Sequence, residues 1–158
     1  MQKITPFLWF DGQAEEAANL YVSLFADAEI TGVSRYPEGA PGPTGEVMTV
    51  SFRLAGQEFT ALNGGPQFPF TEAVSFAVSC EDQAEVDRLW DALIEGGGEP
   101  SQCGWLKDRF GLSWQIVPTR LYELLDDPDR ERAQRAMQAM LQMSKIEIKS
   151  LEDAADAA

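Results

Sequence analysis

The sequence Cys-Gly-Trp-Leu-Lys-Asp-Arg-Phe-Gly-Leu-Ser-Trp-Gln-Ile-Val-Pro, residues 103–118, predicts two β-strands joined by a tight turn. In its second half Leu112, Trp114 and Ile116 alternate with polar residues, which is the period-2 pattern of a strand with one buried face. Gln115 lies among these apolar neighbours. A polar side chain in that position needs hydrogen-bond partners or points into a pocket.

The first 66 residues predict the element order β-α-β-β-β. Ala14, Ala17, Tyr21 and Leu24 recur at the spacing of one helix face, and Asp11 is a favourable N-cap for that helix. The expected elements are a strand at 4–10, this helix to about residue 26, strands at 29–36, 47–54 and 57–62, and a mobile loop rich in proline and glycine at 37–45.

A second β-α-β-β-β pattern begins after residue 72, with a strand at 73–80. Asp82 and Glu85 form a capping box at the start of its helix, and the glycines that begin at Gly96 end it. A short strand at 100–103 and the hairpin at 103–118 complete the pattern, and we expect the charged run Lys107-Asp108-Arg109 at the exposed end of the hairpin.

An internal repeat relates the two halves of the chain. The tripeptide Gln13-Ala14-Glu15 recurs 70 residues later as Gln83-Ala84-Glu85. In the last strand the shift falls to 55, because the second half lacks the long loop. These two shifts align Thr5 with Ser75, Thr60 with Gln115, and Phe59 with Trp114.

The remaining residues, 119–158, predict helices. We expect a short helix near Leu121–Leu125 and a second one that Asp127 caps. Ile146 and Ile148 suggest a short extended segment, and residues 152–158 are expected to be disordered. The expected inward face of the second helix comprises Ala133, Met137, Met140, Leu141 and Ser144.

The sequence therefore predicts an α+β fold: tandem βαβββ modules that form curled mixed sheets, followed by C-terminal helices. The expected organisation is a pair of modules over 1–118, with the modules at 1–66 and 72–118, and a helical extension over 119–158 that ends in a disordered tail.

Composition restricts the functions that the chain can have. The net charge of −14 argues against nucleic acid and membrane partners, because contacts to phosphate need Lys and Arg. The sequence contains no histidine, which removes imidazole bases, Ser-His and Cys-His pairs, and the commonest metal ligand. The two cysteines, Cys80 and Cys103, match no disulfide framework or metal spacing. Without an apolar span or a leader, we expect a cytoplasmic protein.

Three stretches, Pro6–Ala17, Phe59–Pro66 and Cys103–Gly111, carry a likeness to a known family that extends to about residue 151. They resemble the PhnB-like branch of the vicinal oxygen chelate superfamily, which includes glyoxalase I, extradiol dioxygenases and bleomycin resistance proteins. Branch members are often labelled 3-demethylubiquinone-9 3-methyltransferase-like. The resemblance implies the glyoxalase/bleomycin resistance fold, in which each sheet curls into a cup, and a homodimer.

The resemblance also implies where a metal would bind. In the metal-using members, ligands come from the first and last strands of both modules, where this chain has Thr5, Thr60, Ser75 and Gln115. The family pattern has His, Glu or Gln at these positions, whereas three of the four here are hydroxyls. Divalent ions prefer imidazole, thiolate or carboxylate. We therefore expect no metal and no cofactor, and a cup with a neutral polar floor.

The walls of this cup are expected to be aromatic: Trp9, Phe59, Trp105, Phe110 and Trp114 are the candidates, with filling of the core as the alternative for each. Arg35 and Tyr36 precede the loop at 37–45. They are interpreted as surface residues at a strand end, with contact to a ligand at the mouth of the cup as the alternative.

Two main functions remain open, with a structural or regulatory module that binds no small ligand as a third alternative, and the sequence does not decide whether the protein is an enzyme. The first is a metal-free homodimeric protein that binds a small, partly aromatic or cationic molecule. The second is a metal-dependent lyase or transferase of the vicinal oxygen chelate type, with Gln115 joined by Glu46 or Glu58 as ligands. The methyltransferase label has no support in the residues, since no glycine-rich strand-to-helix turn is present.

Overall fold

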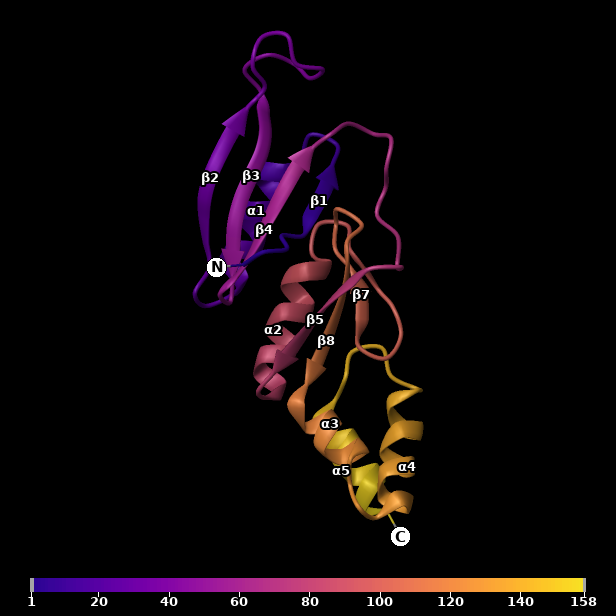
Figure 1. The fold of residues 1–158 in the computed structure, drawn as a ribbon. Helices are drawn as coiled ribbons and strands as arrows, with labels where there is room; N and C mark the ends of the chain where they lie inside the picture. The colour runs from indigo at the N-terminus through magenta and orange to yellow at the C-terminus, as the bar shows by residue number, and fades with distance from the viewer. Residues whose placement is uncertain (1, 158) are drawn as a thin grey trace. The chain divides into compact units, whose positions relative to one another are not determined.

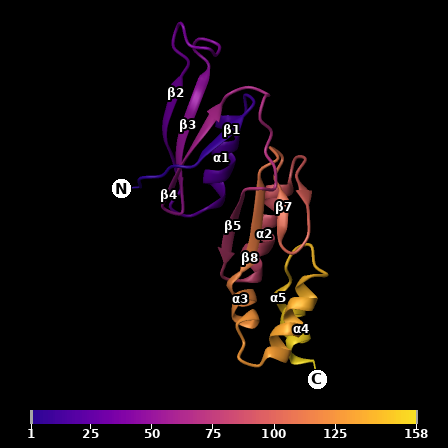
Figure 2. The same cartoon turned by 45° about the vertical axis from the view of Figure 1, so that its right-hand side comes forward.

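The computed structural model describes residues 2–157, which form two compact units that divide between Phe70 and Thr71. Figures 1 and 2 trace the chain through both units from two directions. Each unit contains one four-stranded mixed sheet with a helix between its first two strands. The predicted α+β class with two βαβββ modules and C-terminal helices is confirmed.

The first unit has the sheet order β1-β4-β3-β2, with β1 and β4 parallel and the other pairs antiparallel. Its helix packs on one face of the sheet, where the rings of Tyr21 and Phe52 lie 6.2 Å apart between centroids. The opposite face stays more open, and Phe7 there is 62% exposed. The elements are β1 (Phe7–Phe10), α1 (Ala14–Leu24), β2 (Glu29–Arg35), β3 (Val47–Leu54) and β4 (Gln57–Asn63).

The second unit repeats this plan in the order β5-β8-β7-β6. The repeat extends to the strand register: Phe7 pairs with Thr60 in the first unit, and Ala77 pairs with Gln115 in the second. These pairs are related by the shifts of 70 and 55 seen in the sequence. The elements are β5 (Ser75–Cys80), α2 (Gln83–Ile94), β6 (Glu99–Pro100), β7 (Trp105–Lys107) and β8 (Ser113–Pro118).

Three helices follow β8: α3 (Thr119–Leu125), α4 (Arg130–Met140) and α5 (Ile148–Asp156). The expected extended segment at 146–148 and disordered tail from 152 are wrong, because α5 continues to Asp156. Ala158 lies outside the described residues. The cap of α4 is Asp129 and not Asp127, since the carboxylate of Asp129 accepts from the backbone N–H groups of residues 131 and 132.

Distant residues hold both ends of α5. At its start, the backbone N–H of Ile148 donates to Oε1 of Gln83 at 2.7 Å. At its end, Nη2 of Arg135 donates to the carbonyl of Ala155 at 2.7 Å, and Arg132 also contacts that carbonyl. These contacts satisfy terminal groups that a helix leaves without an internal partner. The partners are remote in sequence, so no local sequence pattern predicts the helix.

The inward face of α4 also differs from the expected one. Ala133 and Ala136 are buried, whereas Met137 and Leu141 are 38% and 52% exposed. Small residues face inward because α5 packs close to α4. The side chain of Arg135 on α4 therefore reaches the last carbonyls of α5. A separate hydrophobic core joins these helices to the end of β8; it comprises Val117, Leu121, Leu124, Ala136, Ile146, Leu151 and Ala155.

The turn between β7 and β8 is built around a buried carboxylate. Asp108 is 2% exposed, which contradicts its expected place at an exposed hairpin end. Its Oδ1 accepts from the backbone N–H groups of Phe110 and Leu112, at 2.9 and 3.1 Å, and its Oδ2 accepts from the indole of Trp114 at 2.9 Å. The carboxylate therefore fixes both the turn and the indole that β8 sends into the core.

We predict that Asp108→Ala lowers the free energy of unfolding by about 3 kcal/mol, because three buried donors lose their acceptor. Asp108→Asn should cost less, since its amide oxygen still accepts from the backbone while its NH₂ opposes the Trp114 indole. Urea unfolding followed by far-UV circular dichroism measures both. Asp91→Asn, an exposed position on α2, serves as control; an Asp108→Ala variant as stable as this control would contradict the role.

Candidate functional site

Ser75 and Gln115, two of the expected floor residues, lie together in the second unit. Nε2 of Gln115 donates to Oγ of Ser75 at 2.9 Å, and both side chains are half-buried. Because side chains alternate along a strand, Gln115 is on the face of β8 opposite to Trp114. Ser113 shares the face of Gln115, and its buried Oγ has no hydrogen-bond partner among the described residues.

The other two floor residues, Thr60 and Thr5, belong to the first unit and differ in burial. Thr60 is 9% exposed, and its backbone N–H donates to the carbonyl of Pro6 at 3.0 Å. Thr5 is exposed and precedes β1, which begins at Phe7 and not at the expected Ile4. The structure therefore extends the parallel pairing of first and last strands to Pro6, and leaves the side chain of Thr5 at the surface.

These positions do not fit the metal that the resemblance to the vicinal oxygen chelate superfamily implies. The amide nitrogen of Gln115 donates to Ser75, an arrangement of two neutral groups without thiolate or carboxylate. Within residues 2–157, no three side chains of Asp, Glu or Cys gather in a geometry that could hold an ion. Glu58, one alternative ligand, is exposed, and Glu46, the other, borders a cavity of the first unit.

The expected wall residues divide into core and surface positions. Phe59 stacks on Phe52 with ring centroids 5.5 Å apart, and Trp114 meets Phe76 edge-on at 5.4 Å. Phe59 and Trp114 are thus core residues at equivalent places in the repeat. Trp105 and Phe110 are half-buried, and the guanidinium of Arg109 lies 4.9 Å from the Phe110 ring. Only Trp9 borders one of the cavities described below.

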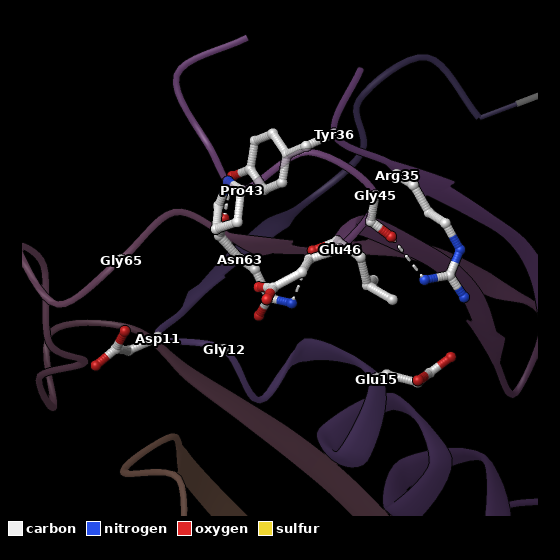
Figure 3. A pocket seen from close by; sticks show the side chains of 11 residues that line it. Asp11, Gly12, Glu15, Arg35, Tyr36, Pro43, Gly45, Glu46, Asn63 and Gly65 are labelled. Carbon is white, nitrogen blue, oxygen red and sulfur yellow. Dashed lines mark hydrogen bonds between the residues drawn. The ribbon is translucent and has the colours of Figure 1, made fainter. Parts of the chain in front are cut away.

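Two adjoining cavities of the first unit lie where β1 and β4 end and where the loop 37–45 begins and returns. Their volumes are about 420 and 520 Å³. Both are bordered by Tyr36, Pro43, Asn63 and Gly65. Figure 3 shows the first cavity from close by, with side chains from the strand ends, the loop and α1 around it.

Asn63 organises this region. Its Oδ1 accepts from the backbone N–H of Ala14 at 2.9 Å, and its Nδ2 donates to the carbonyl of Val47 at 3.1 Å. The Tyr36 hydroxyl donates to the Asn63 carbonyl, which closes the base of the loop (Figure 3). Asn63 therefore caps α1, and neither the expected Asp11 nor the residue at the N-cap position, Gln13, does so.

The two cavities differ in chemistry. The smaller is bordered by the exposed carboxylates of Asp11, Glu15 and Glu46 and by one cation, Arg35. The larger is bordered mainly by apolar and backbone groups: Trp9, Tyr36, Pro41, Gly42, Pro43, Met48, Leu62, Asn63, Gly64, Gly65 and Gln67. The region thus joins an acidic compartment to an aromatic one.

A further cavity, of about 620 Å³, lies between α2, α3 and α5 in the second unit. Its charged groups are largely paired with one another. Arg120 contacts Glu123 and Glu152, and Lys149 contacts Asp153 at 3.0 Å. The contact with Glu123 is the main cause of a raised pKa for Arg120. These pairs neutralise both cations that border the cavity, Arg120 and Lys149, so this cavity is the weaker candidate for a ligand.

Sequence reasoning found Trp9, noted Arg35 and Tyr36, and named Glu46 as an alternative metal ligand. It missed Asp11 and Glu15 as residues that border the cavity, and it missed the capping role of the Asn63 side chain. The available signals were the polar end of β4 and the long loop that the second module lacks. A side chain that caps a helix 49 residues away leaves no spacing pattern to detect.

We predict that Asn63→Ala lowers the free energy of unfolding by about 2 kcal/mol, because it removes the cap of α1 and the bond to the Val47 carbonyl. Asn63→Asp keeps the acceptor and adds a negative charge near the start of α1, so its loss should be smaller. Chemical denaturation measures both changes. Amide exchange at Ala14 should accelerate in Asn63→Ala; unchanged exchange would contradict the capping role.

Comparisons with known proteins agree with this architecture. A model of the 3-demethylubiquinone-9 3-methyltransferase family matches residues 2–117. No curated protein matches the chain significantly. A solved structure from Bacillus cereus, described as a putative 3-demethylubiquinone-9 3-methyltransferase, PhnB protein, is 41% identical, with a TM-score of 0.68 over 74% of this chain and 99% of that one.

Two more distant structures share the fold. Protein PA1353 from Pseudomonas aeruginosa is 22% identical, with a TM-score of 0.61 over 75% of this chain and 98% of that one. A gene product from Arabidopsis thaliana is 21% identical, with a TM-score of 0.52 over 74% of this chain and 98% of that one.

Within residues 2–157, no helix has the length and apolar character needed to cross a membrane. On the family match and the 41% identity, this chain belongs to the PhnB-like, 3-demethylubiquinone-9 3-methyltransferase family.

Proposed function

We propose that this protein binds a small organic molecule in the paired cavities of its first unit, without a metal ion, and that it works as a homodimer. The observation that carries the proposal is a pocket with fixed walls. Trp9 donates from Nε1 to the carbonyl of Gly65 at 2.8 Å, and Tyr36 is bonded to Asn63. Volumes of about 420 and 520 Å³ fall within the usual range for small-molecule sites.

The pre-formed walls favour binding, because little side-chain order must be gained when a ligand enters. The ring of Phe68 meets Trp9 edge-on, with centroids 4.9 Å apart. A Cβ on Gly64 would lie 2.3 Å from the Trp9 ring, so the indole rests directly on the backbone there. The pocket therefore presents an aromatic side chain whose position is already determined.

Support for the metal-free form comes from the neutral groups at the superfamily ligand positions, where Gln115 already donates to Ser75. Support for the homodimer comes from apolar side chains on α4 and at its C-cap, since Met137 and Leu141 are 38% and 52% exposed. The methyltransferase name belongs to the family description and to the Bacillus cereus relative, and we do not extend that activity to this chain.

We predict that Trp9→Leu weakens the binding of a small aromatic ligand at least about tenfold, because a hot-spot aromatic contact is lost. A thermal-shift screen of aromatic fragments selects the ligand, and isothermal titration calorimetry measures its Kd. Trp105→Leu is the matched control, because Trp105 is also half-buried but lies in the second unit and borders none of the described cavities.

Loss of binding in Trp105→Leu but not in Trp9→Leu would place the ligand on the open sheet face of the second unit and contradict the proposed pocket. Pro43→Ala, at an exposed loop position that borders both cavities, gives a second test if Trp9→Leu is poorly folded.

A further prediction concerns metal. Protein purified without chelator should hold substoichiometric zinc, nickel, manganese and iron by elemental analysis, because the positions that would bind them are neutral. EDTA should leave the Tm unchanged, since only a ligand that binds the folded state raises it. One divalent ion per chain, together with a lower Tm after chelation, would instead support the metal-dependent lyase or transferase.

A further inference from the structure

The loop at residues 37–45 borders both cavities of the first unit, and the proposed function does not say how a ligand passes it. We propose that this loop is a lid, which opens to admit the ligand to the larger cavity and closes against Tyr36 once the ligand is bound. This inference rests on the proposed function, and it names the element that controls ligand exchange at the same pocket.

The loop forms one side of the larger cavity, and the strands form another. Pro41, Gly42 and Pro43 border the cavity from the loop. The residues that border it from β1, β3 and β4 are Trp9, Met48, Leu62 and Asn63. A ligand that fills the cavity contacts both sides, so it binds the protein with the loop closed more tightly than with the loop open.

The βαβββ module does not need this loop in order to fold. The second unit has the equivalent sheet order and strand register without a counterpart of the long loop. In the first unit the N–H of Gly45 donates to the carbonyl of Tyr36 at 2.9 Å, which closes the hairpin of β2 and β3 at the base of the loop. The loop is thus an insertion that projects beyond the ends of these two strands (Figure 1).

Few interactions hold the loop to the rest of the unit. Within residues 2–157, every hydrogen bond found for residues 37–45 stays inside the loop or joins it to residues 35, 36 and 46. Most of the loop is exposed, and only Ala40 and Gly42 are half-buried. Segments with few buried contacts open at a low cost in free energy, so this loop can move while β2 and β3 stay paired.

Gly42 is the point where the closed loop meets a fixed side chain. A Cβ on Gly42 would overlap three atoms of the Tyr36 ring, so the backbone there lies directly against the ring. The ring is itself held in place, because the Tyr36 hydroxyl donates to the carbonyl of Asn63. The contact between Gly42 and the ring depends on dispersion forces, which are weak for each pair of atoms. It therefore closes the loop reversibly.

The composition of the loop favours movement as one piece. Each of its three prolines fixes φ, and the N–H of Ala40 donates to the carbonyl of Pro37 at 3.2 Å, which stiffens the loop internally. Gly45, where the loop returns to β3, has a φ of 86°, in the region that glycine adopts without strain. We therefore place the pivot of the lid at Gly45.

The first test removes the lid. Replacing residues 37–44 with the dipeptide Asn-Gly joins Tyr36 to Gly45 by a two-residue hairpin turn, and the existing bond between these two residues closes that turn. Stopped-flow tryptophan fluorescence follows the binding of the ligand that the fragment screen selects. In the unaltered chain, the observed rate should level off at high ligand concentration, at the rate of lid opening. In the shortened chain it should rise linearly, and the ligand should dissociate at least about tenfold faster.

The second test keeps the loop and disturbs only its closed position. In Gly42→Ala the added Cβ overlaps the Tyr36 ring, so the plateau of the observed rate should rise by up to about tenfold, as expected for an overpacked contact. Thr44→Ala is the matched control: Thr44 is exposed in the same loop and borders neither cavity, so the plateau should not change.

The motion of the lid is also measurable without a ligand. Nuclear magnetic relaxation dispersion of ¹⁵N should detect exchange on the microsecond-to-millisecond timescale at the amides of the loop and not at those of β3. In Gly42→Ala the chemical shifts of the loop amides should move toward those of the minor, open state.

The outcomes separate the lid from the pocket. If the loop amides show no such exchange, if the observed rate in the unaltered chain rises linearly, or if Gly42→Ala and Thr44→Ala behave alike, the lid is overturned. Binding that is sensitive to Trp9→Leu would then still support the pocket. If no fragment binds at all, the proposed function is overturned, and the lid with it.

Discussion

The parallel pairing of the first and last strands is the interaction on which each unit depends. Parallel neighbours cannot be joined by a tight turn, so the chain must cross over, and a helix that crosses over covers one face of the sheet. Phe7 pairs with Thr60, and Ala77 pairs with Gln115 at the equivalent place in the second unit. Both units therefore make this parallel pairing in the same register. The uncovered face is where Gln115 and Ser75 meet, and it exists because only one helix covers each sheet.

The two units differ in how they secure that crossover helix. In the first unit the last strand ends at Asn63, which pairs with Phe10 and caps α1 from across the sheet. The equivalent position in the second unit is Pro118, which pairs with Cys80 and has no side-chain acceptor. There, Asp82 caps α2 locally by accepting from the N–H of residue 85 at 2.9 Å. Asn63 thus caps α1 and also lies at the edge of the candidate pocket. The same side-chain hydrogen bonds therefore stabilise both the helix and the pocket wall.

Sequence patterns predicted what is periodic or repeated. The alternation in β8, the face of α1 and the duplicated Gln-Ala-Glu tripeptide were sufficient for the element order. The resemblance, and not a pattern, named Ser75 and Gln115, which lie within hydrogen-bond distance of each other. Sequence patterns did not predict which polar side chains are held in place by several hydrogen bonds. Asp108 is charged and adjacent to a turn, which favours exposure, yet three hydrogen bonds make its burial favourable. Asn63 is the same kind of case.

The C-terminal helices lie beyond the part of the chain that the family model covers, because the model ends at residue 117 and α3 begins at residue 119. The segment that follows α4 is nevertheless part of the second unit. Its carbonyls at Met143 and Ser144 accept from the N–H groups of Cys103 and Gly104, each at 2.8 Å. Both donors have a positive φ, 58° and 86°. A residue other than glycine in that conformation is uncommon, so the backbone at Cys103 takes a costly shape that directs two successive N–H groups at the segment between α4 and α5. A Cβ on Gly104 would lie 3.1 Å from Ile146, a core residue of the same segment. The hairpin at 103–118 is therefore shaped by residues 143–146 as well as by its own sequence, and the unit that folds is longer than the part that the family shares.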